Sequence, residues 1–173
     1  MSTQIIVASD THGASQLLPL LEKAYPEADA YLHCGDLEDD PRMYLYWIFV
    51  GGNNDFFFDA QMPEERVVSV NGVRVFMTHS HRFSYYRREE QIVAKAKEKG
   101  CQIAVYGHTH VPSIVKRDGV WLINPGSMRL PRDGRSGCYA VIEVDNEGHI
   151  SAGLFHEEDW PFESPIKPFK WRW

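Results

Sequence analysis

The sequence predicts an α/β fold with parallel strands at its centre, and three observations support this. The β-branched run Gln4–Ser9 has the pattern of a strand that is buried on both faces. An amphipathic stretch with an apolar face of leucines follows it. Further short apolar runs come at Ala30–Cys34 and at about Leu45–Val50. A strand, a helix and further strands in this order predict a parallel βαβ core.

Two helices are predicted in the first hundred residues. The first begins near Leu17 or Leu18, because Pro19 is tolerated only in the first turn of a helix. The second extends over about Arg87–Lys99 and ends at Gly100, a residue that favours the left-handed C-terminal position. Its predicted buried face consists of Ile92, Val93 and Ala96.

A hairpin and several strands complete the pattern. Asn71-Gly72 lies between the apolar runs Arg66–Val70 and Val73–Thr78, and this dipeptide favours a tight turn because both residues tolerate positive φ. A strand at Gln102–Tyr106 follows the second helix, and residues 113–155 are rich in strand and turn signals.

Length and charge limit the class of protein. A chain of 173 residues with 43% hydrophobic and 24% charged residues fits a single domain that spans residues 1–173. The net charge of −6 disfavours dedicated DNA binding, which needs a basic surface. A nucleotide-sized substrate is still compatible with this charge if bound metal ions receive its phosphate.

The cysteines and the N-terminal segment predict the compartment. Cys34, Cys101 and Cys138 are odd in number and lack C-x-x-C spacing, so we expect buried thiols in a reducing environment. The N-terminal residues have no basic region before the first apolar run, and no apolar run approaches about 18 residues. We therefore expect a cytoplasmic protein without a membrane segment.

Five predicted strands end in side chains of the metal-ligand type. In an open α/β sheet such strand ends converge on one crevice, and a cluster of histidines and carboxylates there is what a metal site requires. Each short motif alone also fits a cap or a polar turn, but coincidence at every strand end is a poor explanation. The set is Asp10, His12, Asp36, Asn53, His79, His108 and His110.

The motifs D-x-H, G-D, G-N-x-D, a strand-terminal T-H and G-H-T-H occur in this order. Together they resemble those of the calcineurin-like metallophosphoesterase superfamily, and within it the small YfcE-type phosphodiesterases. The resemblance extends from Ile5 to about Phe155 and includes the loop Asn124–Ser127. It implies a four-layer αββα sandwich with two mixed β-sheets and a metal site at the C-terminal ends of the strands.

The same resemblance implies two divalent metal ions and divides the ligands between them. The first ion would be held by Asp10, His12, Asp36 and His110. The second would be held by Asp36, Asn53, His79 and His108, with Asp36 as the bridge. Ligands of nitrogen and oxygen without thiolate suit Mn²⁺, which we expect first, and also Ni²⁺, Co²⁺, Fe²⁺ or Zn²⁺.

The implied activity is that of a phosphodiesterase, a hydrolase of class EC 3.1. Two metal ions about 3.5–4 Å apart lower the pKa of a bridging water, so that a bridging hydroxide attacks the phosphodiester. Two alternatives are a non-catalytic protein-binding scaffold, resembling the retromer subunit of this superfamily, and a phosphomonoesterase. The physiological substrate and the oligomeric state, including a homodimer, are left open by the sequence.

The candidates for catalysis are Asp36, His81, Asn54 and Asp55. Many superfamily members have histidine at the position of Asn54, where it is proposed to protonate the leaving group. Asn has no titratable proton near neutral pH, so better leaving groups are expected unless His81 substitutes. His81 would lie on the same side as His79 if that segment is extended, although a surface role is an alternative. Ser80 stands where the family more often has glycine, and a serine fits there if φ is negative.

Substrate contacts are expected from Asn53 and Arg82. Arg82 opens the segment Arg82–Arg88, which either lines the substrate entrance or forms a solvated helix start. A similar ambiguity applies to residues 126–137, which contain three arginines. The aromatic tail, about residues 157–173, would dock on its own domain or contact a second subunit.

Overall fold

The computed structural model describes residues 2–58 and 61–166. Within these ranges ten strands form two five-stranded sheets, accompanied by two α-helices, α1 (Leu17–Ala24) and α2 (Arg88–Glu98). Sheet A has the order β10 (Ile150–His156), β9 (Cys138–Val144), β1 (Thr3–Ala8), β2 (Ala30–His33), β3 (Trp47–Phe49). Sheet B has the order β4 (Glu65–Val70), β5 (Val73–Thr78), β6 (Ile103–Tyr106), β8 (Val120–Asn124), β7 (Ser113–Arg117). Short 3₁₀ turns lie at η1 (Pro41–Met43) and η3 (Glu157–Asp159).

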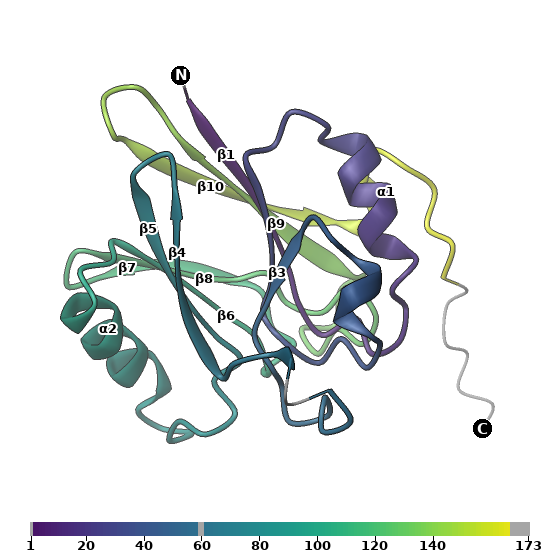
Figure 1. Ribbon diagram of the computed structural model, residues 1–173, viewed down its shortest axis with the longest axis horizontal. Coiled ribbons are helices and arrows are strands. Elements are labelled where there is room, and N and C mark those ends of the chain that lie inside the picture. The colour runs from purple at the N-terminus through teal and green to yellow at the C-terminus, as the bar shows by residue number, and fades with distance from the viewer. Residues whose placement is uncertain (1, 59–60, 167–173) are drawn as a thin grey trace.

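The two sheets pack face to face between the two helices, as Figure 1 shows, and the expected four-layer sandwich is confirmed. Successive residues of a strand face opposite sides of its sheet. Ile5 of β1 therefore joins the core between the sheets, while Ile6 packs in the cluster that contains Leu17 of α1. On the far side, Phe76 of β5 packs with Ile92 of α2.

Both sheets are mixed, with parallel strands at their centres. In sheet A, β1 pairs with β2 and β2 with β3 in parallel, whereas β9 and β10 are antiparallel. In sheet B, β5, β6 and β8 are parallel, and β4 and β7 are antiparallel edge strands. The parallel strands therefore deliver several chain segments to the same end of the molecule.

The predicted turns and helices agree with the structure. Asn71 and Gly72 have φ of 48° and 85°, so both adopt the left-handed conformation that the hairpin requires. Pro19 lies in the first turn of α1. The predicted buried face of α2, formed by Ile92, Val93 and Ala96, is also confirmed.

The third strand is shorter than predicted. The sequence predicted a strand over Leu45–Val50, but β3 comprises only Trp47–Phe49. The backbone turns before it, because the Trp47 N–H donates to the carbonyl of Tyr44. Leu45 and Tyr46 are consequently 87% and 71% exposed, which the apolar run did not predict.

The described part of the tail packs against its own chain. Trp160 is buried in the cluster next to α1, and its Nε1–H donates to the carbonyl of Phe155 at 2.9 Å. Phe162 packs on Trp160 with ring centroids 5.3 Å apart. Residues 167–173, which contain the other aromatic anchors of the tail, lie outside the described residues. Contact of the tail with a second subunit stays a prediction.

The three cysteines are free and buried, as the sequence predicted. In residues 2–58 and 61–166, none of the helices has both the length and the apolar character needed to cross a membrane.

Candidate metal centre

Five strand ends of the two sheets bring polar side chains to one place. Asp10 follows β1, Asp36 follows β2 and Asn53 follows β3 in sheet A. From sheet B, β5 ends directly before His79, and β6 ends directly before the G-H-T-H stretch. The convergence that the sequence predicted is therefore present in the structure.

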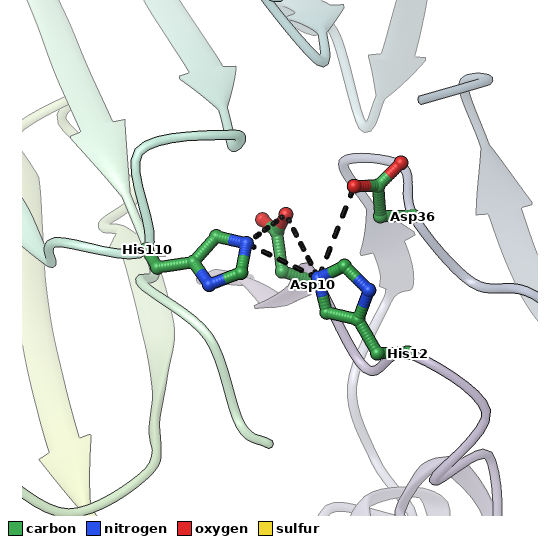
Figure 2. Close-up of side chains that lie close together, drawn as sticks. All are labelled: Asp10, His12, Asp36 and His110. Atoms are coloured by element: carbon green, nitrogen blue, oxygen red, sulfur yellow. Dashed lines mark hydrogen bonds and ion pairs between the residues drawn. The ribbon is translucent and has the colours of Figure 1, made fainter. Parts of the chain in front are cut away.

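One group of four side chains points toward a common centre, as Figure 2 shows. His110 Nε2 lies 3.0 Å from Asp10 Oδ1 and 3.1 Å from His12 Nε2. His12 Nε2 is also 3.8 Å from Asp10 Oδ1 and 3.8 Å from Asp36 Oδ2. One ligand atom from each residue lies within 4.8 Å of the others, which is the spacing expected around a single cation.

The histidine protons point away from this centre. His12 Nδ1 is 2.5 Å from the Glu38 carboxylate, and His110 Nδ1 is 2.6 Å from the carbonyl of Leu130. Both partners only accept hydrogen bonds, so each Nδ1 carries a proton, and a ring with that single proton presents an Nε2 lone pair to the centre. Two lone pairs facing each other at 3.1 Å repel unless a cation or a proton lies between them.

Asp10 also has an acceptor atom that faces the centre without a hydrogen-bond donor. Its Oδ2 accepts hydrogen bonds from the Ser9 hydroxyl at 2.5 Å and from the His108 backbone N–H at 3.1 Å. Its Oδ1 is buried, and none of the described residues donates a hydrogen bond to it. A buried carboxylate oxygen without a donor is costly, and a metal ion at the centre of the group would remove that cost.

A second group of ligand atoms lies beside the first. His79 Nε2 is 3.1 Å from Asn53 Oδ1 and 3.4 Å from Asp36 Oδ2. His108 Nδ1 is 3.0 Å from the same Asn53 oxygen. The His79 Nδ1–H donates to the carbonyl of Cys34 at 2.7 Å, so its Nε2 also faces inward. Asp36 is common to the two groups, which is the arrangement that the resemblance implied.

The two residues after Asn53 hold Asp36 in place. The backbone and side-chain N–H groups of Asn54 donate to the two oxygens of Asp36 at 2.9 and 2.7 Å. Asp55 is 1% exposed and accepts from the backbone N–H groups of Asp36, Glu38 and Gly52 at 2.7–2.8 Å. Its carboxylate is directed to these amides rather than to the cluster, so the structure gives Asp55 a positioning role.

The charges of the cluster are mutually dependent. Burial opposes ionisation of Asp36, but His79 and the Asn54 donors hold the pKa of its carboxyl well below the ordinary value. Burial opposes the charge on His79 as well, yet Asp36 and Asp10 raise its pKa. Burial, His79 and the positive charge of Arg88 lower the pKa of His108 to about 4, so its ring is neutral at pH 7.

The backbone of the site is conformationally unusual. Outside glycine, the described residues include nine with positive φ, and two of them lie in hairpin turns. The other seven belong to the cluster or adjoin it, at a cost of about 1 kcal/mol or more each. They are Asp10, His12, Asp36, Glu38, Ser80, His108 and His110.

The local backbone at Ser80 differs from the prediction. Its φ is +76°, so the expectation of a negative φ was wrong, and the segment between His79 and His81 is not extended. Burial of Ser80 and a hydrogen bond from its hydroxyl to the carbonyl of Gly107, at 3.3 Å, accompany this conformation. The His81 ring nevertheless lies 5.4 Å from the His79 ring, between centroids.

His81 and Arg82 line a cavity of about 500 Å³ beside Asn53. Burial, His79 and Arg82 lower the pKa of His81, and its Nδ1 is buried with no partner among the described residues. Arg82 forms an ion pair with Glu64 at 2.5 Å and is 71% exposed, so its charge is already compensated.

Sequence reasoning did not identify the residues that orient the ligands. Glu38 and the carbonyl of Leu130 fix two histidine rings, and neither position carries a motif of its own. The loop Asn124–Ser127 supports two site segments, since Ser127 Oγ donates to the carbonyl of Asp10 at 2.7 Å and Asn124 Nδ2 donates to Thr109 Oγ1 at 2.9 Å.

A separate group of acidic residues and histidine, formed by Asp145, Glu147 and His149, lies in an exposed turn. Asp145 accepts hydrogen bonds from the backbone of the other two residues, so a turn-forming role accounts for its position.

Comparison with known proteins identifies the family of this chain. Residues 3–147 match the family described as the calcineurin-like phosphoesterase superfamily domain. The chain is 31% identical over 147 residues to the probable metallophosphoesterase YsnB of Bacillus subtilis, covering 83% of this chain and 85% of that protein. It is 33% identical over 105 residues to the phosphodiesterase YfcE of Escherichia coli, covering 57% of this chain and 53% of that protein.

A solved structure is also similar. The crystal structure of a conserved uncharacterized protein, a predicted phosphoesterase from Streptococcus pneumoniae, superposes with a TM-score of 0.83 and 30% sequence identity. The similarity covers 94% of this chain and 95% of that one.

Proposed function

The chain belongs to the calcineurin-like phosphoesterase superfamily, and from this premise we propose that it is a dinuclear metal-dependent phosphodiesterase. The family implies phosphate-ester substrates and divalent metal ions. The specific proposal is that Asp10, His12 and His110 hold one ion, that Asn53, His79 and His108 hold the other, and that Asp36 bridges them.

One observation carries this proposal. Three histidines direct their Nδ1 protons to carbonyl or carboxylate acceptors, which leaves three Nε2 atoms directed at the same carboxylates, where they offer lone pairs once a metal ion replaces any proton. Without a cation these inward-facing acceptors oppose one another. A ligand set of nitrogen and oxygen atoms fits Mn²⁺, which we propose as the native metal, and also suits neighbouring divalent ions.

The protein supplies positioning and charge. When bound, the two ions would lower the pKa of a water nucleophile and neutralise the phosphoryl oxygens of the substrate. Asn54 and Asp55 hold Asp36 in place. Asn54 donates to both carboxylate oxygens of Asp36, and Asp55 accepts from its backbone N–H.

His81 is the proposed proton donor to the leaving group. It lies at the wall of the cavity next to Asn53, and its unpartnered Nδ1 leaves one ring nitrogen available for a new hydrogen bond. His81→Ala should lower turnover of esters with poor leaving groups while esters of 4-nitrophenol are hydrolysed almost as before. Equal losses on both kinds of ester would argue against this role.

The proposed activity is tested with Mn²⁺-loaded protein on an aryl diester, an aryl monoester, a cyclic nucleotide and a nucleotide pyrophosphate. We expect the diester to be hydrolysed fastest. Asp36→Ala and His108→Ala should abolish turnover and reduce bound metal, measured by elemental analysis, while circular dichroism stays unchanged.

His149→Ala is the matched control, because it removes a histidine from the exposed group in the turn and should change neither metal content nor activity. Wild-type turnover in metal-depleted Asp36→Ala protein would refute the proposed centre. Two bound metals without turnover of any substrate would instead favour a protein-binding scaffold.

A further inference from the structure

A second cavity, of about 390 Å³, adjoins the metal centre on the side of sheet B. It lies between the loop that precedes α2 and the G-H-T-H stretch, and Thr109 is part of its wall. Thr109 lies between His108 and His110 in the sequence, and the charge of Arg88 acts on the His108 ring, so the cavity lies near the second group of ligands. Its volume is in the range of small-molecule sites, about 300–1,000 Å³.

The charges that line this cavity do not balance. Arg87 pairs with Glu90 at 2.9 Å, and Arg117 pairs with Glu89 at 3.3 Å. Arg88 has no acidic partner among the described residues, so the cavity wall carries one uncompensated positive charge.

Arg88 is also short of a hydrogen-bond acceptor. Its Nε is buried, and none of the described residues accepts a hydrogen bond from it. Arg88 is the first residue of α2, where the helix dipole disfavours a positive charge. Neither feature stabilises the folded protein, and the Arg88 guanidinium is available to pair with an anion.

Two exposed tyrosines also line this cavity. Tyr85 and Tyr86 are 79% and 91% exposed, and their rings contact each other edge to face with centroids 5.2 Å apart. Exposed aromatic rings beside an unpaired arginine form a combination suited to a planar base and a phosphate.

We propose that this cavity is a nucleotide subsite, in which Arg88 binds a second phosphate and the Tyr85–Tyr86 pair stacks on the base. The inference rests on the proposed function, because it places the scissile phosphate of the same substrate at the adjoining metal centre. The substrate class is therefore a nucleotide ester that carries a phosphate besides the one that is hydrolysed.

Three substrates with one leaving group isolate each contact. They are methyl 4-nitrophenyl phosphate, the 4-nitrophenyl ester of thymidine 5′-monophosphate, and the same ester with an additional 3′-phosphate. The kcat/KM ratio of the third to the second measures the contribution of the extra phosphate. The ratio of the second to the first measures the contribution of the nucleoside.

The wild-type protein should prefer the substrate with the 3′-phosphate. In Arg88→Gln this preference should fall about 10- to 100-fold, the range expected for a charge-assisted hydrogen bond. Arg87→Gln is the matched control, because Arg87 lines the same cavity but is paired with Glu90, and it should keep the preference. Replacement of both tyrosines by alanine should lower the second ratio about tenfold.

Binding provides a readout that does not depend on turnover. Calorimetry with thymidine 3′,5′-bisphosphate and thymidine 5′-monophosphate should show that Arg88→Gln weakens only the binding of the bisphosphate. Failure of the wild type to hydrolyse methyl 4-nitrophenyl phosphate would count against the proposed function, while the binding comparison would still test the subsite. Equal preference and equal binding in the wild type and Arg88→Gln would overturn the inference.

Discussion

Replacement of Asp55 by asparagine tests whether this residue acts in the chemistry or positions the ligands. The change keeps the shape of the side chain and removes one acceptor. In the structure Oδ2 accepts from the backbone N–H groups of Asp36 and Gly52, and Oδ1 accepts from that of Glu38. The single oxygen of asparagine can serve only one of these two sets.

The expected cost follows from this geometry. If the amide oxygen faces Asp36 and Gly52, its NH₂ group opposes the Glu38 N–H, so two donors lie about as close as the present 2.8 Å bond. One charge-assisted hydrogen bond is lost, at about 1.5–3 kcal/mol, and a donor is stranded, at about 1–3 kcal/mol. Because the Glu38 amide is only partly buried, we expect a loss of about 3 kcal/mol in the free energy of unfolding.

Urea denaturation of the metal-free protein measures this loss. Asp133→Asn is the control, because Asp133 accepts one backbone hydrogen bond at 3.1 Å in an exposed turn, and its replacement should cost less than about 1 kcal/mol. Metal affinity of Asp55→Asn should fall about 10- to 100-fold, since Glu38, whose carboxylate orients the His12 ring, loses its support. Wild-type stability and metal affinity combined with lost turnover would show that Asp55 acts in the chemistry instead.

Three further predictions concern metal, packing and pH. Addition of Mn²⁺ at 100 times its Kd should raise the free energy of unfolding by about 2.7 kcal/mol per site. The Tm should rise accordingly, a chelator should reverse the rise, and His110→Ala should not show it. An unchanged Tm in the wild type would contradict metal binding. Gly107→Ala should destabilise the protein by about 1–3 kcal/mol, measured by urea denaturation, because the new Cβ would lie 2.1 Å from Ser9 Oγ and 2.7 Å from Asp10 Oδ2. Burial lowers the pKa of His33 to about 4, so the folded state holds its neutral ring and the unfolded state binds more protons. The contribution of His33 to the free energy of unfolding is complete above about pH 6.5 and is lost toward pH 4, by about 1.4 kcal/mol per pH unit. Denaturation is measured from pH 7 to pH 4.5 in the wild type and in His33→Gln. If His33→Gln loses stability with pH as steeply as the wild type, the reasoning is refuted.

Much of the fold could be predicted from the sequence, because local signals and burial patterns agree in this chain. The Asn71-Gly72 turn, the position of Pro19 and the face of α2 each depend on rules that act within a few residues. The start of β3 could not be predicted, because the turn at Tyr44 depends on the preceding 3₁₀ segment rather than on the apolar run.

The sequence predicted that the proposed ligands lie close together, but it did not predict the residues that support them. Histidines and carboxylates at strand ends are visible in the sequence, since sheet topology brings such ends together. The partners that orient them, such as Glu38 and the carbonyl of Leu130, lie in segments without a distinguishing pattern. The sequence gives no reason to treat Arg88 and Arg82 differently. In the structure Arg82 forms an ion pair with Glu64, whereas Nε of Arg88 has no acceptor among the described residues.

The positive-φ residues of the cluster lie in its loops and not in the strands, so stability and ligand placement depend on different parts of the chain. The sheets provide stability with relaxed geometry, while the loops at their ends hold the conformations that the metal ligands need. A glycine relieves the strain of a positive φ, so Ser80→Gly should raise the Tm without changing a metal ligand, whereas the same change at His108 or His110 would remove one. Ser80 is thus a position where natural variation can adjust the durability of the protein independently of its chemistry.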